Sequence, residues 1–143
     1  MKILIVEARF YEDIADELVK GAIEVIEAAG AEYDRISVPG AFEIPGAIRF
    51  AADGNDGYDG YVALGCVIRG ETSHYDYVCE ESAHALQNLI VKDKLAIGYG
   101  ILTVENQDQA WARCSVEKLN KGGSVAEAAI RMIELKKQYG LIR

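Results

Sequence analysis

The feature that most constrains the fold of this chain is the alternation of short apolar runs with longer stretches in which apolar residues recur at helical spacing. A continuous aliphatic run is typical of a strand that helices cover on both faces. The predicted strands are residues 2–6, 35–38, 61–67 and 95–102. Helical spacing follows at residues 14–29, 78–90, 107–113 and 124–139. This alternation predicts a parallel sheet built from strand–helix–strand units.

The order of the elements predicts a three-layer α/β fold, in which a four-stranded parallel sheet is doubly wound in the flavodoxin-like manner. The length of 143 residues suits one domain, so we expect residues 1–143 to form a single domain. Pro39 and Pro45 should bound a loop, with a short helix from Pro45 to about Gly54. Ligands of such folds bind beyond the carboxyl ends of the strands, where four polar loops are expected to meet. These loops are residues 8–11, 39–45, 69–76 and 103–106.

The charge balance excludes two classes of partner. With 15 Lys and Arg against 23 Asp and Glu, the formal net charge is −8, which repels both nucleic acid and an anionic membrane surface. The apolar runs are too short to span a bilayer and no cleavable leader pattern opens the chain. We therefore expect a soluble, cytoplasmic protein that binds neither nucleic acid nor membranes.

The cysteines and histidines give no metal or cofactor motif. Cys66, Cys79 and Cys114 are an odd number at spacings that fit neither a disulfide framework nor a metal-binding pair, so reduced thiols are expected. Cys66 is close in sequence to His74, yet its apolar strand favours a buried, inert thiol over a nucleophile. We expect no metal and no cofactor.

A possible anion site lies between the third strand and the helix that follows it. In the run Arg69-Gly70-Glu71-Thr72, backbone N–H groups and a hydroxyl can turn toward a phosphate, although a tight loop with a helix cap is the plainer interpretation. Without a Walker A or dinucleotide motif, any phosphate would belong to a small metabolite. His74 comes next, and its imidazole suits proton transfer at neutral pH, the alternative being a packing residue.

Further candidate residues follow the other strands. Glu43, fixed between two prolines, could accept hydrogen bonds from polyol hydroxyls or be merely solvated. Phe10 and Tyr99 are predicted at strand ends on the same rim, where they could stack on a planar heterocycle or line the core. Arg113 and Lys121 offer positive charge in an acidic chain, or are scattered surface bases.

Together these strings resemble the 6,7-dimethyl-8-ribityllumazine synthase family of riboflavin biosynthesis. The resemblance runs in family order over nearly the whole chain, and two of its strings, PGAFEIP and GCVIRGET, are hard to place in any other family. The matching strings are Arg9-Phe10, VPGAFEIP at 38–45, ALGCVIRGET at 63–72, HYDYVC at 74–79, GILT at 100–103, QA at 109–110 with Arg113, and NKG at 120–122.

The resemblance implies a cofactor-independent transferase. Such an enzyme condenses 5-amino-6-(D-ribitylamino)uracil with 3,4-dihydroxy-2-butanone 4-phosphate and releases phosphate and water, in the penultimate step of the pathway. It implies that His74 transfers protons and that the remaining residues bind substrate. By resemblance, Phe10 stacks on the pyrimidine, Ala41, Phe42 and Glu43 hold the ribityl chain, Cys66, Val67 and Ile68 meet the ring edge, and Glu71 and Thr72 hold the phosphate.

The resemblance also implies a homo-oligomer whose site lies between subunits, with Tyr99, Arg113 and Lys121 supplied by the neighbouring chain. Two departures from the family bear on its size: residues 115–119, with Glu117, replace a segment usually rich in Gly and Lys, and the N-terminal segment is nearly absent. We expect a pentamer rather than a 60-subunit shell, with riboflavin synthase as a candidate partner. The alternative function is a catalytically inactive scaffold that binds flavin or lumazine, or forms a shell.

Overall fold

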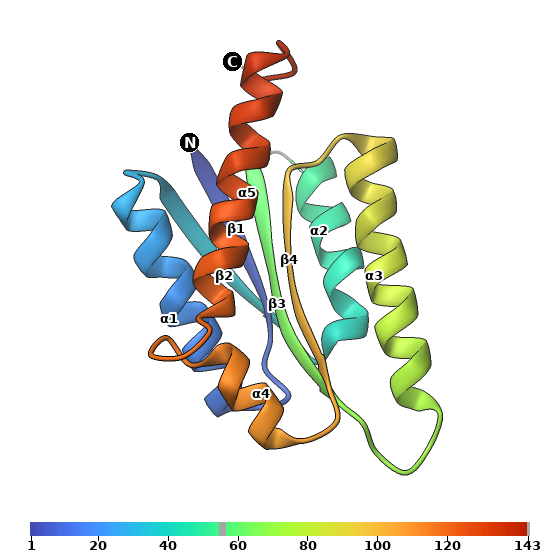
Figure 1. Cartoon of the computed structure of the whole chain (residues 1–143). Coiled ribbons are helices and arrows are strands. Elements are labelled where there is room, and N and C mark those ends of the chain that lie inside the picture. Colours follow the sequence, from blue (N-terminus) through green and yellow to red (C-terminus); the bar gives the residue numbers. More distant parts are fainter. Residues whose placement is uncertain (55–56, 143) are drawn as a thin grey trace.

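The computed structural model describes residues 1–54 and 57–142, and it contains one four-stranded sheet in the order β2-β1-β3-β4. All of the strand pairs are parallel, with Val6 of β1 opposite Ala63 of β3, and Ala63 opposite Tyr99 of β4. The strands are β1 (Lys2–Ala8), β2 (Glu32–Val38), β3 (Gly60–Ile68) and β4 (Ile97–Val104). The four predicted strands are confirmed, and their carboxyl ends lie at one edge of the sheet (Figure 1).

Helices cover both faces of this sheet, which confirms the three-layer α/β fold (Figure 1). Ile3 and Ile5 of β1 pack into the layer with the helices α1 and α5, whereas Leu4 and Val6 pack into the layer on the other face. The first layer consists of α1 (Glu12–Ala28), α4 (Gln107–Cys114) and α5 (Lys121–Gln138). The second consists of the 3₁₀ helix η1 (Ala41–Glu43), α2 (Ile44–Asp53) and α3 (His74–Asp93).

The segment between the two prolines is not a loop throughout, so that prediction is wrong. Residues Ala41–Glu43 form a 3₁₀ turn, and α2 begins at Ile44, one residue before Pro45. The turn closes because the Glu43 carboxylate accepts the backbone N–H of Gly40 at 3.0 Å. A carboxylate that binds a backbone donor at the start of a helix stabilises that turn, which sequence periodicity does not reveal.

Several element boundaries also differ from the prediction. The strand β2 begins at Glu32 rather than at residue 35, because it pairs with β1 from Lys2 onward even though its side chains are mostly exposed. The helix α5 begins at Lys121, three residues before the predicted start, because the Asn120 side chain caps it by accepting the N–H of Gly123 at 3.3 Å. Polar residues at the start of β2 and of α5 interrupt the apolar pattern, so the sequence placed both starts too late.

Glycines allow α5 to approach its neighbours closely. A Cβ at Gly122 would collide with the backbone of Leu18 in α1, and a Cβ at Gly98 in β4 would collide with the backbone of Val125 in α5. By contrast, a Cβ at Gly46 in α2 would meet no atom within 4 Å. An added methyl group would therefore clash at Gly122 in α5 but not at Gly46 in α2.

None of the helices in the described part of the chain has both the length and the apolar character needed to cross a membrane.

We predict that Gly122→Ala lowers the free energy of unfolding by about 2 kcal/mol, because the added methyl group forces α1 and α5 apart. The matched variant Gly46→Ala should raise it by about 0.5 to 1 kcal/mol, because alanine restricts the unfolded chain and favours the helix. Urea unfolding at a fixed protein concentration measures both. Equal effects of the two substitutions would contradict this account of α1–α5 packing.

Candidate active site

A cavity of about 350 Å³ opens at the carboxyl ends of the strands, beside η1 and the start of α3. Its lining combines aromatic, carboxylate and imidazole side chains. Of the predicted site residues, the structure brings eight together here: Phe10, Ala41, Phe42, Glu43, Cys66, Val67, Ile68 and His74.

Phe10 lies in the three-residue turn between β1 and α1, at one wall of the cavity. Its ring is 73% exposed and makes an edge-to-face contact with Tyr11, with ring centroids 4.9 Å apart. Because most of the Phe10 ring is exposed at the cavity wall, a planar ligand could stack on it.

Glu43 and its neighbours form the wall contributed by η1. Ala41 is buried in the apolar core between the sheet and the layer of α2 and α3, whereas Phe42 is 58% exposed. One Glu43 carboxylate oxygen is held by the N–H of Gly40, so the group has a defined direction while its other oxygen can accept further hydrogen bonds. A carboxylate fixed in this way suits recognition of hydroxyl groups.

The end of β3 contributes Cys66, Val67 and Ile68. The Cys66 side chain is buried, and this desolvation raises the pKa of its thiol to about 12. The thiolate is the nucleophilic form, so at neutral pH Cys66 is a protonated, apolar group. The three cysteines are free thiols, as predicted.

The loop after β3 presents backbone donors beside the cavity. Residues 69–74 are exposed, and the Thr72 hydroxyl accepts the N–H of His74 at 3.3 Å as α3 begins. The helix α3 is 20 residues long, so its amino end carries partial positive charge toward this loop. The loop can therefore attract an anion through N–H groups.

The cation next to this loop is already engaged. The Nε atom of Arg69 donates to Glu105 at 2.8 Å, and its Nη1 atom donates to Asp76 at 3.4 Å. The guanidinium also lies over the Tyr75 ring, 4.2 Å from its centroid. Two carboxylates thus compensate the charge of Arg69 and hold the ends of β3, β4 and α3 together.

His74 is the first residue of α3, and its exposed side chain lines the cavity. It shares the cavity lining with Phe10 and Glu43, and it directly follows the loop of residues 69–73. An imidazole in this place can give or take a proton at an atom of a bound ligand.

Five predicted site residues do not line this cavity within the one chain: Glu71, Thr72, Tyr99, Arg113 and Lys121. Glu71 and Thr72 are exposed residues of the loop between β3 and α3. The prediction that Tyr99 lies at a strand end is wrong, because β4 extends to Val104 and Tyr99 is only its third residue. Arg113 is on α4, where its Nη1 atom donates to the Gln109 carbonyl oxygen at 2.9 Å. Lys121 is the exposed first residue of α5. A role for Tyr99, Arg113 and Lys121 at a neighbouring chain's cavity stays a prediction.

Sequence reasoning missed three lining residues, Tyr11, Gly40 and Val78. Val78 follows His74 by four positions in α3, so helical spacing could have found it. Tyr11 and Gly40 were adjacent to predicted residues, but no pattern separated them from ordinary loop positions.

Across residues 1–54 and 57–142, no cluster of three or more His, Cys, Asp or Glu side chains could hold a metal ion.

Nearly the whole sequence is similar to a known protein family. The model of the family described as 6,7-dimethyl-8-ribityllumazine synthase matches residues 1–137. A protein of that name from Agrobacterium fabrum is 61% identical, over 96% of this chain and 96% of its own length. Another from Bartonella tribocorum is 59% identical, over 96% of this chain and 91% of its own length. A protein from Rhizobium meliloti named 6,7-dimethyl-8-ribityllumazine synthase 1 is 58% identical, over 96% of this chain and 93% of its own length.

With a match that extends over most of its length and relatives this similar, the chain belongs to the 6,7-dimethyl-8-ribityllumazine synthase family.

Proposed function

We propose that this chain condenses 5-amino-6-(D-ribitylamino)uracil with 3,4-dihydroxy-2-butanone 4-phosphate to form 6,7-dimethyl-8-ribityllumazine, phosphate and water. The observation that carries the proposal is the cavity itself. It combines an exposed aromatic ring (Phe10), a directed carboxylate (Glu43) and an imidazole (His74) beside a loop of backbone donors. These features suit a flat ring, a polyol chain, a proton transfer and an anion.

The pyrimidine substrate would occupy the Phe10 end. Its ring would stack on Phe10, and its exocyclic edge would meet backbone groups of Cys66, Val67 and Ile68 at the end of β3. The ribityl hydroxyls would donate to Glu43, whose carboxylate is held by Gly40. Ala41 and Phe42 would cover the chain's apolar carbons.

The proton transfers would fall to His74. Imine formation between the pyrimidine's amine and the butanone's carbonyl, elimination of phosphate and closure of the second ring each require a proton to be moved. An imidazole is suited to both roles near neutral pH. The protonated Cys66 thiol would serve only as part of the wall.

The phosphate would lie at the loop of residues 69–73, bound by the backbone N–H groups of Glu71 and Thr72. These groups supply hydrogen bonds but little net charge, and Arg69 is already bound to two carboxylates. In a chain of net charge −8, a phosphate dianion needs a further cation. We infer that Arg113 and Lys121 of a neighbouring copy supply it, a guanidinium being able to bind a phosphate through paired N–H groups.

A homo-oligomer follows from this inference, and we propose a pentamer rather than a 60-subunit shell. The number of large aromatic side chains that are exposed in the single chain supports association, which would cover some of them. They include Phe42, Phe50, Tyr99 and Trp111, which are 58%, 78%, 42% and 41% exposed. Tyr99 would face the neighbour's cavity.

Three further proposals concern the whole chain. We infer one domain over residues 1–143, because the apolar cores of both helical layers pack against a single sheet. Free thiols at all three cysteines favour a reducing compartment, hence the cytoplasm. Riboflavin synthase, which would use the lumazine product, is a candidate partner.

We predict that His74→Ala lowers the rate of lumazine formation roughly 10² to 10⁴-fold, the usual effect of losing a general acid or base. The reaction is followed by lumazine absorbance and fluorescence, after subtraction of the rate without protein. Lys92→Ala, at the opposite end of α3, is a control that should keep the wild-type rate. A wild-type rate in the His74 variant would exclude His74 from the mechanism.

We also predict that two inactive variants restore each other. Neither His74→Ala nor Arg113→Ala should be active alone, but oligomers assembled from both should regain about a quarter of the wild-type activity. In randomly mixed oligomers, about one site in four receives an intact His74 from one chain and an intact Arg113 from its neighbour. Native mass spectrometry verifies that the oligomers are mixed. Mixed oligomers without activity would show that His74 and Arg113 are not supplied to one site by two different chains.

A further inference from the structure

Glu7 is the only charged side chain that is buried among residues 1–54 and 57–142, and it is 3% exposed. It is the penultimate residue of β1 and points into the layer of α1 and α5. A carboxylate removed from water is strongly unfavourable unless cations and donors compensate it. The side chains that compensate the charge of Glu7 should therefore be needed for the stability of the folded chain.

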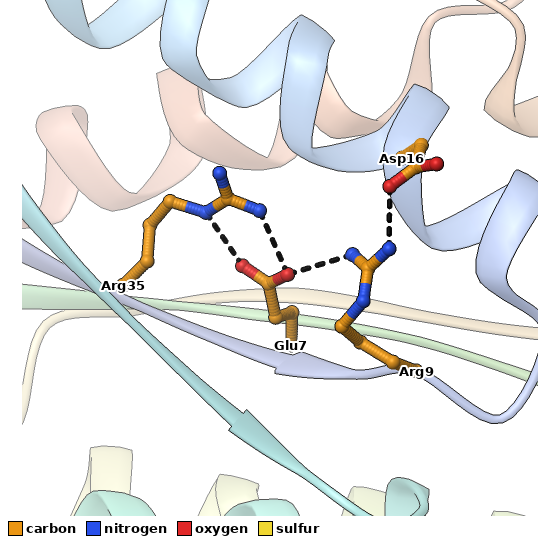
Figure 2. Close-up of polar contacts among 4 residues, drawn as sticks. All are labelled: Glu7, Arg9, Asp16 and Arg35. Carbon is orange, nitrogen blue, oxygen red and sulfur yellow. Dashed lines mark hydrogen bonds and ion pairs between the residues drawn. The ribbon is translucent and has the colours of Figure 1, made fainter.

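Two guanidinium groups bind Glu7 from opposite sides (Figure 2). Arg35 of β2 donates through Nε and Nη2, both at 2.9 Å, and Arg9 donates through Nη1 at 2.8 Å. The Nη2 atom of Arg9 also donates to Asp16 of α1. The four side chains carry two positive and two negative charges, so the network is neutral and each member compensates another.

The two arginines differ in what they fix. Arg35 links the neighbouring strands β1 and β2 within the sheet. Arg9, by contrast, is the first residue after β1, and it connects that strand to α1 across a turn of three residues. The residue after Arg9 is Phe10, whose exposed ring makes few contacts of its own.

We propose that Glu7 is a positioning residue that acts through Arg9 to fix the β1–α1 turn, so that the Phe10 ring is held in place before the pyrimidine substrate binds. This inference rests on the proposed function and adds residues that do not line the cavity. A preorganised ring binds more tightly because less freedom is lost on binding. The effect should therefore concern the pyrimidine end of the site and spare the phosphate end.

The experiment compares steady-state kinetics of Arg9→Ala and Arg35→Ala, which remove one guanidinium each from the same carboxylate. Arg9→Ala should raise the KM for the ribitylaminouracil about tenfold, the order of effect expected when a site must be ordered on binding. Its kcat and its KM for the butanone phosphate should stay within about twofold. Arg35→Ala should lower the thermal midpoint but leave both KM values unchanged.

Two further variants keep the test decisive if Arg9→Ala does not fold. Asp16→Ala leaves Glu7 with both arginines and should raise the same KM by a smaller factor. Arg9→Lys, which can reach Glu7 or Asp16 but cannot fork onto both, should give a KM between those of wild type and Arg9→Ala. Circular dichroism confirms folding of each variant.

Equal KM values for Arg9→Ala and Arg35→Ala, with lumazine still formed by the wild type, would overturn the positioning role alone. An equal rise in KM for both substrates would overturn it too, because a general loss of structure would have that effect. A wild-type chain that forms no lumazine would remove the proposed function and this inference with it.

Discussion

Parallel pairing of the four strands is the constraint on which the rest of the structure depends. In a parallel sheet every carboxyl end lies at the same edge, so the loops after β1, β2 and β3 meet there although they are distant in sequence. That edge places Phe10, Glu43 and His74 around one cavity.

Two arginines hold this edge in the same manner. Arg9 directly follows β1 and binds Glu7 and Asp16, while Arg69 directly follows β3 and binds Asp76 and Glu105. Each guanidinium connects a strand end to the amino-terminal part of the next helix. Both cations are thereby compensated and contribute order rather than net charge. An anionic substrate consequently needs a cation from outside this cavity, which is why the proposed site requires a second copy.

The parts of the structure predicted from sequence are those that local patterns determine. The apolar runs located all four strands, and the helical spacing at 78–90 located the body of α3, although that helix begins four residues earlier, at His74. Eight of the predicted residues line one cavity because the order of strands and helices fixed which loops would meet. The parallel topology thus converted a local pattern into a spatial arrangement.

The parts that sequence missed depend on contacts between distant residues. Glu7 and Arg35 are 28 positions apart, and no periodicity indicates their ion pair. Tyr99 was expected at the rim although the predicted strand at 95–102 already contained it, and pairing opposite Ala63 places it in the first half of β4. The 3₁₀ turn of η1 depends on one carboxylate bound to one backbone N–H.

The central claim is that two copies of the chain complete one cavity. A crystal structure of the assembled protein, soaked with an unreactive analogue of the ribitylaminouracil and with inorganic phosphate, tests it most directly. We expect the pyrimidine ring on Phe10, and the phosphate between the N–H of Thr72 and an arginine from the adjacent subunit. A phosphate held by one chain alone, or an analogue bound away from Phe10 and His74, would contradict the account.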